Sequence, residues 1–272
     1  MRSADALARM SGLSRLEARM LLAHTLERPA AWLLAHGDEP VAPELADAFL
    51  SLAARRRQGE PMAYLVGMRE FMGHDFVVTP SVLIPRPESE LLVEAAMQSL
   101  TNVKSPSILD LGTGSGAIAI SLALALPDAR VTATDISADA LTVAQRNAQR
   151  LGAKIQWWQG SWYTALPAEG RFDLIVSNPP YVRSGDPHLA QGDLRFEPVG
   201  ALTDGDDGLS ALRQIVSGAA AHLNHGGSIW MEHGFDQANS VRLMLTDAGY
   251  NHVITMVDLA GLDRITGGTL SL

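Results

Sequence analysis

The feature that most constrains this fold is a regular alternation of short apolar runs with segments of helical spacing, which begins near residue 107. Each apolar run has the length of a buried strand, and each intervening segment is long enough for a crossover helix. Strands joined by such crossovers lie parallel in one sheet that helices cover on both faces. The expected strands are residues 107–111, 130–134, 155–158, 172–177 and 228–232, and the expected helices are 88–100, 117–126, 138–151, 209–223 and 237–248. The chain is therefore predicted to be an α/β protein.

The first 60 residues lack this alternation and are predicted to be helical. Residues 16–26 carry apolar side chains at helical spacing behind Ser14, which is placed as an N-cap. Residues 43–57 form a second expected helix with one apolar face. The expected domains are a helical segment over 1–60, a hairpin linker over 61–84 and the α/β domain over 85–272.

Two hairpins are expected outside the alternating region. In the linker, the β-like runs 64–67 and 76–79 flank Gly73. At the end of the chain, runs 252–257 and 264–272 follow one another without a helix between them, which predicts an antiparallel pair at the sheet edge.

Charge and composition argue against several classes of function. Hydrophobic residues make up 47% of the 272, yet no apolar stretch approaches the ~20 residues of a membrane span. Residues 1–80 carry 9 basic and 10 acidic side chains and residues 81–272 carry 12 and 20, so −8 of the net charge of −9 falls on residues 81–272. The only basic cluster, Arg55-Arg56-Arg57, is interpreted as a solvated helix end. Neither membrane nor direct nucleic-acid binding is therefore expected.

The absence of cysteine narrows the chemistry further. It excludes disulfides, thiolate metal ligands and cysteine nucleophiles, and no metal site is predicted. Asp5 also comes too early for a secretory signal. We expect a cytoplasmic enzyme.

A glycine-rich turn follows the strand 107–111 and opens the next helix. Glycines allow a tight turn and let a ligand approach the backbone, a logic that dinucleotide-binding folds share. Two details favour S-adenosylmethionine: the spacing is Gly-x-Gly-x-Gly, and Asp110 precedes it where a carboxylate can meet a cationic amino-acid end. A strand-end cap is the alternative for Asp110. The residues of the turn are Gly112, Thr113, Gly114, Ser115 and Gly116.

Two further residues follow neighbouring strands and are candidate cofactor contacts. Asp135 ends the strand after the glycine turn, where an acidic side chain can accept hydrogen bonds from ribose hydroxyls. Its alternative role is to cap the following helix, which Ser137 could do equally well. Trp162 follows the third strand and is a candidate to lie against adenine, with core packing as the alternative.

The tetrapeptide Asn178-Pro179-Pro180-Tyr181 is a rigid polar turn at the carboxyl end of strand 172–177, where open α/β sheets bind their ligands. The Asn178 side-chain carbonyl and the Pro179 backbone carbonyl can together accept both hydrogens of a planar –NH2 group. Tyr181 offers a flat face against that group. The turn therefore predicts a site for an amide or an exocyclic amine, although a proline-rich strand cap is the simpler alternative.

Taken in order, these motifs resemble class I S-adenosylmethionine-dependent methyltransferases that methylate amino groups. Over nearly the whole chain, the sequence is most similar to the release factor glutamine methyltransferase family, also called PrmC or HemK. The segments that carry this similarity beyond the shared core are Arg55-Arg56-Arg57-Gln58-Gly59-Glu60-Pro61, Arg69-Glu70-Phe71, Ile84-Pro85-Arg86-Pro87-Glu88-Ser89-Glu90 and Gly192-Asp193-Leu194-Arg195-Phe196-Glu197-Pro198. The chain departs from the family pattern in a short N-terminal start and in Ser89, where threonine is frequent.

The resemblance implies a helical N-terminal substrate-docking domain, a β-hairpin linker and a seven-stranded Rossmann-like methyltransferase domain. It implies methyl transfer from S-adenosylmethionine to the side-chain N5 of the glutamine in the Gly-Gly-Gln motif of class 1 peptide-chain release factors, by a monomer. The glycine turn, Asp135, Trp162 and Asn178 would contact the cofactor. Residues 178–181 would hold the glutamine, with Asn178, Pro179 and Tyr181 catalytic. Glu88, Glu90 and Glu197 are expected to support the site structurally.

Three other functions stay open from the sequence alone. An adenine-N6 methyltransferase acting on nucleic acid would also need a site for a planar –NH2, but the acidic α/β part argues against it. A related enzyme methylates a glutamine of a ribosomal protein. A non-catalytic binding module on the translation machinery would not need an intact cofactor turn, so binding of S-adenosylmethionine discriminates it.

Overall fold

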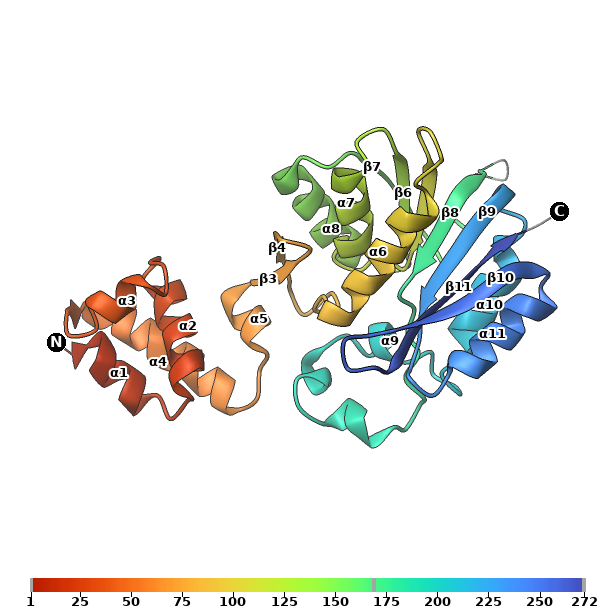
Figure 1. The fold of residues 1–272 in the computed structure, drawn as a ribbon. Coiled ribbons are helices and arrows are strands. Elements are labelled where there is room, and N and C mark those ends of the chain that lie inside the picture. The colour runs from red at the N-terminus through yellow and green to blue at the C-terminus, as the bar shows by residue number, and fades with distance from the viewer. Residues whose placement is uncertain (1, 168–169, 271–272) are drawn as a thin grey trace. The chain divides into compact units, whose positions relative to one another are not determined.

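The computed structural model describes residues 2–167 and 170–270, and this part of the chain forms two compact units (Figure 1). The first unit comprises the described residues up to Met68 together with Gln191–Phe196, and the second comprises the rest. The division falls inside the stretch predicted as a linker. Gln191–Phe196, which the sequence analysis assigned to the α/β domain, clusters with the first unit.

The first unit is helical, as the spacing of its apolar residues predicts. Its helices are α1 (Ala4–Met10), α2 (Arg15–Thr25), α3 (Trp32–Ala35), α4 (Pro43–Arg57) and α5 (Met62–Val66), with two short paired strands, β1 (Arg2–Ser3) and β2 (Pro40–Val41). Ser14 caps α2 in a reciprocal capping box with Glu17, and Pro43 at the first turn of α4 lacks the N–H that would go unpaired there. Leu7, Leu21 and Phe49 are fully buried between the helices.

Arg55 and Arg57 at the end of α4 are exposed, in line with the predicted solvated helix end, whereas Arg56 is half-buried. Arg55 forms an ion pair with Glu60, and Arg56 lies 2.8 Å from Glu17 and 3.3 Å from Asp193. Arg56 therefore helps to hold segment Gln191–Phe196 on the first unit, a contact that the sequence did not predict.

The predicted linker hairpin is present but lies several residues later at its first strand. Residues 64–67 were expected to be extended, whereas they end α5, and Gly67 terminates that helix in the left-handed region at φ 76°. The hairpin strands are β3 (Met68–Phe71) and β4 (His74–Val77). Met72 and Gly73 both have positive φ, as a two-residue hairpin turn requires. A four-residue apolar run cannot by itself distinguish a strand from one helical turn.

The second unit is built on a seven-stranded sheet with the order β10-β11-β9-β8-β5-β6-β7 in the described part of the chain. The strands are β5 (Ser107–Leu111), β6 (Arg130–Asp135), β7 (Ile155–Gln159), β8 (Phe172–Ser177), β9 (Leu223–Glu232), β10 (Tyr250–Val257) and β11 (Asp263–Leu270). Neighbours from β9 to β7 are parallel, and β11 is antiparallel to both β9 and β10. The sheet and its terminal hairpin confirm the predicted fold class; residues 271–272 of the expected last strand lie outside the described residues.

Helices cover both faces of this sheet (Figure 1). One face carries α6 (Glu90–Ser99), α7 (Ala117–Ala125) and α8 (Ala138–Leu151), and the other carries α10 (Ser210–Ala219) and α11 (Ala238–Asp247). The shorter helices of this unit are η1 (Pro87–Ser89), η2 (Pro187–Ala190) and α9 (Val199–Leu202), whereas η3 (Leu194–Phe196) belongs to the first unit. The helix expected over 209–223 ends at Ala219, because Leu223 already begins β9. No helix in the described ranges is both long and apolar enough to cross a bilayer.

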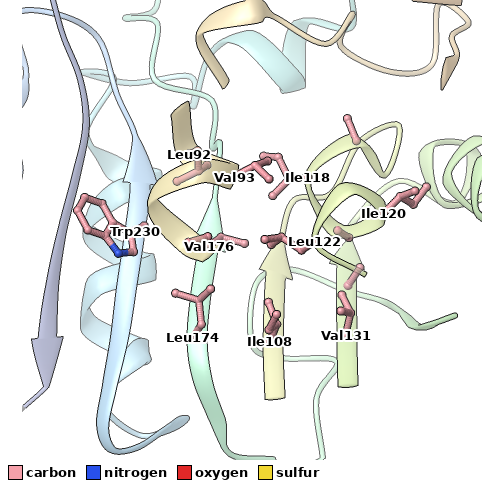
Figure 2. Close-up of a cluster of buried hydrophobic side chains, with 14 of the residues drawn as sticks. Leu92, Val93, Ile108, Ile118, Ile120, Leu122, Val131, Leu174, Val176 and Trp230 are labelled. Atoms are coloured by element: carbon pink, nitrogen blue, oxygen red, sulfur yellow. The ribbon is translucent and has the colours of Figure 1, made fainter. Parts of the chain in front are cut away.

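Close packing of apolar side chains holds α6 and α7 on their face of the sheet. Leu92 and Val93 from α6 pack with Ile118 and Leu122 from α7 over Ile108 of β5 (Figure 2). Each such side chain contributes ~1.5–3 kcal/mol when fully buried. The strands between the two helical layers are buried on both faces, which explains their continuous apolar runs.

The order of the strands determines where a ligand can bind. The chain enters the sheet at β5, runs outward through β6 and β7, and then returns to β8 on the other side of β5. Leu111 and Ser177, the last residues of β5 and β8, are direct register partners. The glycine turn and the Asn-Pro-Pro-Tyr turn therefore leave neighbouring strands at the switch point of the sheet, where ligands of open α/β sheets bind.

Candidate active site

A cavity of about 530 Å³ opens at the carboxyl ends of β5, β6, β7 and β8. This volume lies within the ~300–1,000 Å³ typical of small-molecule sites. The predicted site residues that line it are Gly112, Thr113, Gly114, Ser115, Asp135, Trp162, Asn178 and Pro180. Asp110, Gly116, Pro179 and Tyr181 are not among its lining residues.

The glycine turn owes its shape to two different close approaches. Gly112 has φ 72°, and a Cβ added there would lie 3.3 Å from the Trp162 ring, so this glycine lets the indole reach the turn. Gly116 has φ 82°, and its Cβ would lie 2.8 Å from the Ile120 side chain. Gly116 therefore packs into the body of the domain instead of lining the cavity.

Asp110 is fully buried, and only one of its two carboxylate oxygens has a hydrogen-bond partner among the described residues. The Thr113 hydroxyl donates to its Oδ2 at 2.7 Å, whereas Oδ1 has no hydrogen-bond partner among the described residues. Burial raises the pKa of Asp110 to about 7, although the hydrogen bond from Thr113 acts in the opposite direction. A buried carboxylate oxygen without a partner is energetically unfavourable and is suited to a donor or a cation.

Asp135 ties the glycine turn to the next helix. Its Oδ2 accepts from the N–H of Gly114 and its Oδ1 from the N–H of Ser137, both at 2.9 Å. Ser137 itself caps α8 by accepting from Ala140, so the capping role falls to Ser137 and Asp135 is left facing the cavity. Burial raises the pKa of Asp135 above its ordinary value.

Trp162 lies in an unfavourable backbone conformation. Its φ is 47°, in the left-handed region that bulky side chains rarely adopt. Strain of this kind persists where the surrounding structure requires it, and here it accompanies an indole that forms part of the cavity wall.

The Asn-Pro-Pro-Tyr turn is held by two residues that the sequence analysis did not assign to the site. The Asn178 Nδ2 donates to Ser89 Oγ at 3.0 Å, and the Ser89 hydroxyl donates to Glu232 Oε2 at 2.6 Å. The Tyr181 hydroxyl donates to the other oxygen, Glu232 Oε1, at 3.0 Å. Ser89 had been noted only as a departure from threonine. Glu232 ends β9 beside β8. Its position at the carboxyl end of a central strand is the sequence signal that could have identified it as a site residue.

Burial governs the ionisation of this group as well. Burial first, and then the neighbouring charge of Glu232, raise the pKa of Tyr181 far above its ordinary value. Tyr181 therefore keeps its proton and acts as a donor, not as a base. Burial also raises the pKa of Glu232, which the hydrogen bonds from Ser89 and Tyr181 oppose.

Two of the predicted supporting glutamates have clear structural partners. Glu197 is buried, pairs with Arg86 and accepts from the N–H of Ile84 at 3.2 Å. Glu90 accepts from the N–H of Met72 at 2.8 Å and so holds the hairpin turn. Among the described residues, no cluster of three or more carboxylate or imidazole side chains could hold a metal ion.

Comparisons with known proteins identify the fold and the family. A family model described as the methyltransferase small domain matches residues 87–192, and one described as the PrmC N-terminal domain matches residues 2–67. A methyltransferase from Pyrococcus furiosus shares the fold with a TM-score of 0.55 at 20% identity, over 80% of this chain and 98% of that one. The Thermus thermophilus 16S rRNA N2 G1207 methyltransferase also has a TM-score of 0.55, at 23% identity, over 75% of this chain and 49% of that one.

Much closer sequence relatives cover almost the full length of both chains. The release factor glutamine methyltransferase of Bordetella pertussis is 61% identical over 95% of this chain and 96% of its own length. Those of Burkholderia pseudomallei and Neisseria gonorrhoeae are 51% and 50% identical over 98% and 95% of this chain and 96% and 94% of their own lengths. Identity of this extent across both units shows that the chain belongs to the release factor glutamine methyltransferase family.

Proposed function

We propose that this chain transfers a methyl group from S-adenosylmethionine to the side-chain N5 of the glutamine in the Gly-Gly-Gln motif of class 1 peptide-chain release factors. Family membership supports the reaction, and the orientation of Asn178 is the observation that connects it to particular residues. Because its NH2 group is bound to Ser89, the amide leaves its carbonyl oxygen for a substrate. A carbonyl acceptor suits the side chain of glutamine, whose –NH2 offers two donors.

The residues at the glycine turn fit the cofactor. The unpartnered Oδ1 of Asp110 is suited to receive a cationic ammonium group, and the cavity beside the turn has the size of a small-molecule site. Asp135 would accept from the ribose hydroxyls and Trp162 would lie against the adenine. Thr113 and Ser115 would complete the wall around the amino-acid end. S-adenosylmethionine supplies a methyl group on a positively charged sulfur when it is bound.

The chain's own residues would act on the glutamine by orientation and charge. An amide nitrogen is a poor nucleophile, because its lone pair is delocalised into the carbonyl. The Asn178 side-chain carbonyl and the Pro179 backbone carbonyl would accept its two hydrogens, align the nitrogen and stabilise the positive charge that develops on it. The flat ring of Tyr181 would pack on the amide plane and exclude water. Its phenol stays protonated and donates to Glu232. No strong base is needed before transfer, because the N–H becomes acidic only as the new bond forms.

The remaining assignments concern partners and place of action. We assign the release factor to the first unit, whose sequence matches the PrmC N-terminal domain over residues 2–67. We also expect a cytoplasmic monomer that does not bind nucleic acid directly, in keeping with the acidic balance of residues 81–272. The named relatives favour release factors over a ribosomal protein or adenine bases as the substrate.

Labelled methyl transfer tests this function directly. The enzyme is incubated with labelled S-adenosylmethionine and either a native class 1 release factor or its variant with alanine in place of the glutamine of the Gly-Gly-Gln motif. We expect label in the native factor alone. Equal labelling of both factors, or labelling of neither by an enzyme that binds the cofactor, would contradict the proposal.

A further inference from the structure

A buried chain of hydrogen bonds runs from the sheet to the substrate-facing amide. It starts at Glu232 on β9, passes through Ser89 in η1 and ends at Asn178, the residue after β8. Its two links measure 2.6 and 3.0 Å. Ser89 and Glu232 are only 3% and 1% exposed, so water does not compete for these groups. These hydrogen bonds join three separate elements of the second unit at Asn178, the residue that is proposed to hold the substrate.

The direction of every link follows from the chemistry of the first group. When Glu232 is ionised, its carboxylate only accepts hydrogen bonds, so the Ser89 hydroxyl donates its single hydrogen to Glu232. Ser89 Oγ is then left as an acceptor, and only the NH2 end of the Asn178 amide can face it. The carbonyl end of Asn178 must consequently point away from Ser89.

Tyr181 is the second donor to the Glu232 carboxylate and helps to fix its orientation. Its hydroxyl donates to Glu232 Oε1, while the serine donates to Oε2, so each carboxylate oxygen has one donor. The same carboxylate thus orients both side chains of the Asn-Pro-Pro-Tyr turn.

We propose that Glu232 and Ser89 are positioning residues that fix which end of the Asn178 amide meets the substrate. An asparagine amide has nearly the same shape when it is flipped, but a flip exchanges its acceptor for two donors. A flipped Asn178 would present N–H groups to a glutamine –NH2 that also offers N–H groups. The inference rests on the proposed function for the identity of the substrate, although the orientation itself is a property of the enzyme alone.

The substitution Glu232→Gln tests the direction of the chain because it changes one carboxylate oxygen into NH2. The Tyr181 hydroxyl donates to the position of Glu232 Oε1, so the carbonyl oxygen of the introduced glutamine is favoured at that position. The NH2 group of the glutamine then points toward Ser89. The Ser89 hydroxyl would then donate to the carbonyl of Asn178 and hold the amide in the wrong orientation. We expect kcat to fall on the order of 10²-fold, the effect of misplacing one preorganised polar contact.

Adding Tyr181→Phe to this variant should partly reverse the loss. Without the phenol hydroxyl, the introduced glutamine is free to turn its carbonyl toward Ser89, and the original direction of the chain is restored. We expect the double variant to be more active than Glu232→Gln alone. A role of Glu232 in stability alone predicts the opposite, because removing a second buried partner could only lower activity further.

Serine variants provide the matched controls. Ser89→Ala removes the link and should lower kcat about tenfold with little change in KM, whereas Ser89→Thr keeps the hydroxyl and should retain activity. Ser121→Ala removes an equally buried hydroxyl, 3% exposed, that lies on α7 and has no hydrogen-bond partner among the described residues. It should leave kcat unchanged.

Hydrogen exchange of the Asn178 side-chain NH2, followed by NMR in the cofactor-free enzyme, separates this inference from the proposed function. In the wild type the hydrogen bonded to Ser89 should exchange slowly. Glu232→Gln should accelerate exchange by turning the NH2 toward the cavity, and the double variant should slow it again. Equal exchange in all three proteins would overturn the inference whatever the substrate is. Failure of the wild type to methylate any release factor, with this pattern intact, would overturn the proposed function alone.

Discussion

Replacing Asp110 with asparagine removes a charge that the fold keeps fully buried. Burial raises the pKa of this carboxyl from 3.8 to about 7, against the hydrogen bond from Thr113 and the nearby Ala119 N–H, and with a smaller contribution from Asp135. Each unit of pH between the two values corresponds to ~1.4 kcal/mol. Ionised Asp110 therefore destabilises the cofactor-free protein by on the order of 4 kcal/mol.

The sign of the pH dependence follows from the raised pKa. The folded protein keeps its proton on Asp110 where the unfolded chain has already lost it, so stability falls as pH rises from about 4 to about 7. Between pH 5 and pH 8 the wild type should lose about 3 kcal/mol that Asp110→Asn does not lose. The introduced NH2 group carries a desolvation cost of ~1–3 kcal/mol, but that cost does not depend on pH.

Urea unfolding of both proteins at pH 5, 6, 7 and 8 without cofactor measures this difference. We expect the stability of Asp110→Asn relative to the wild type to increase by about 3 kcal/mol across the series. Asp128→Asn serves as the control for the loss of one negative charge, because Asp128 is an exposed carboxylate of the same unit. A relative stability that stays constant with pH would refute the reasoning.

The same variant tests the proposed contact with the cofactor. If Asp110 receives the ammonium group of S-adenosylmethionine, its loss should weaken binding roughly 10- to 100-fold, the effect of a hydrogen bond to a charged group. Titration calorimetry at pH 8 measures the affinity. The variant would then be more stable and bind less tightly, and unchanged affinity would argue against the contact.

Three further substitutions test the site and its frame. Asn178→Ala should lower turnover on the order of 10²–10³-fold in a fold that melts normally, and near-normal activity of the purified variant would contradict its role. Asp135→Ala should weaken cofactor binding more than it slows chemistry; an unchanged dissociation constant would exclude the ribose contact. Gly116→Ala should lower the free energy of unfolding by ~1–3 kcal/mol, because φ 82° is strained for a residue with a Cβ and that Cβ would press on Ile120 and Ala144; an unaltered urea midpoint would show that the turn can relax.

The sequence predicted those parts of the fold that depend on long periodic patterns. Residues 43–57 and 138–151 have the bounds of α4 and α8, because their apolar spacing runs over several turns, Pro43 opens the first helix and Ser137 caps the second. The run 64–67 was assigned incorrectly, since four apolar residues fit a strand and a helical turn equally well.

The same difference between local and long-range information decides which site residues could be predicted from the sequence. The residues that follow strand ends, such as Asp135 and Asn178, could be placed at one edge because parallel strands bring their carboxyl ends together. The partners of Asn178 could not be found in this way, because Ser89 and Glu232 lie 89 and 54 positions away in the sequence and meet it only through tertiary packing. No local pattern distinguishes a serine that orients a catalytic amide from one that caps a helix.

The central claim is that the Asn178 carbonyl accepts the amide of the substrate glutamine. A crystal structure of the enzyme with a release factor and the demethylated cofactor product would test it most directly. We expect the glutamine side-chain nitrogen within ~2.7–3.2 Å of both Asn178 Oδ1 and the Pro179 carbonyl oxygen, with Asn178 still bound to Ser89. A glutamine held elsewhere, or an Asn178 that donates to the substrate, would contradict it.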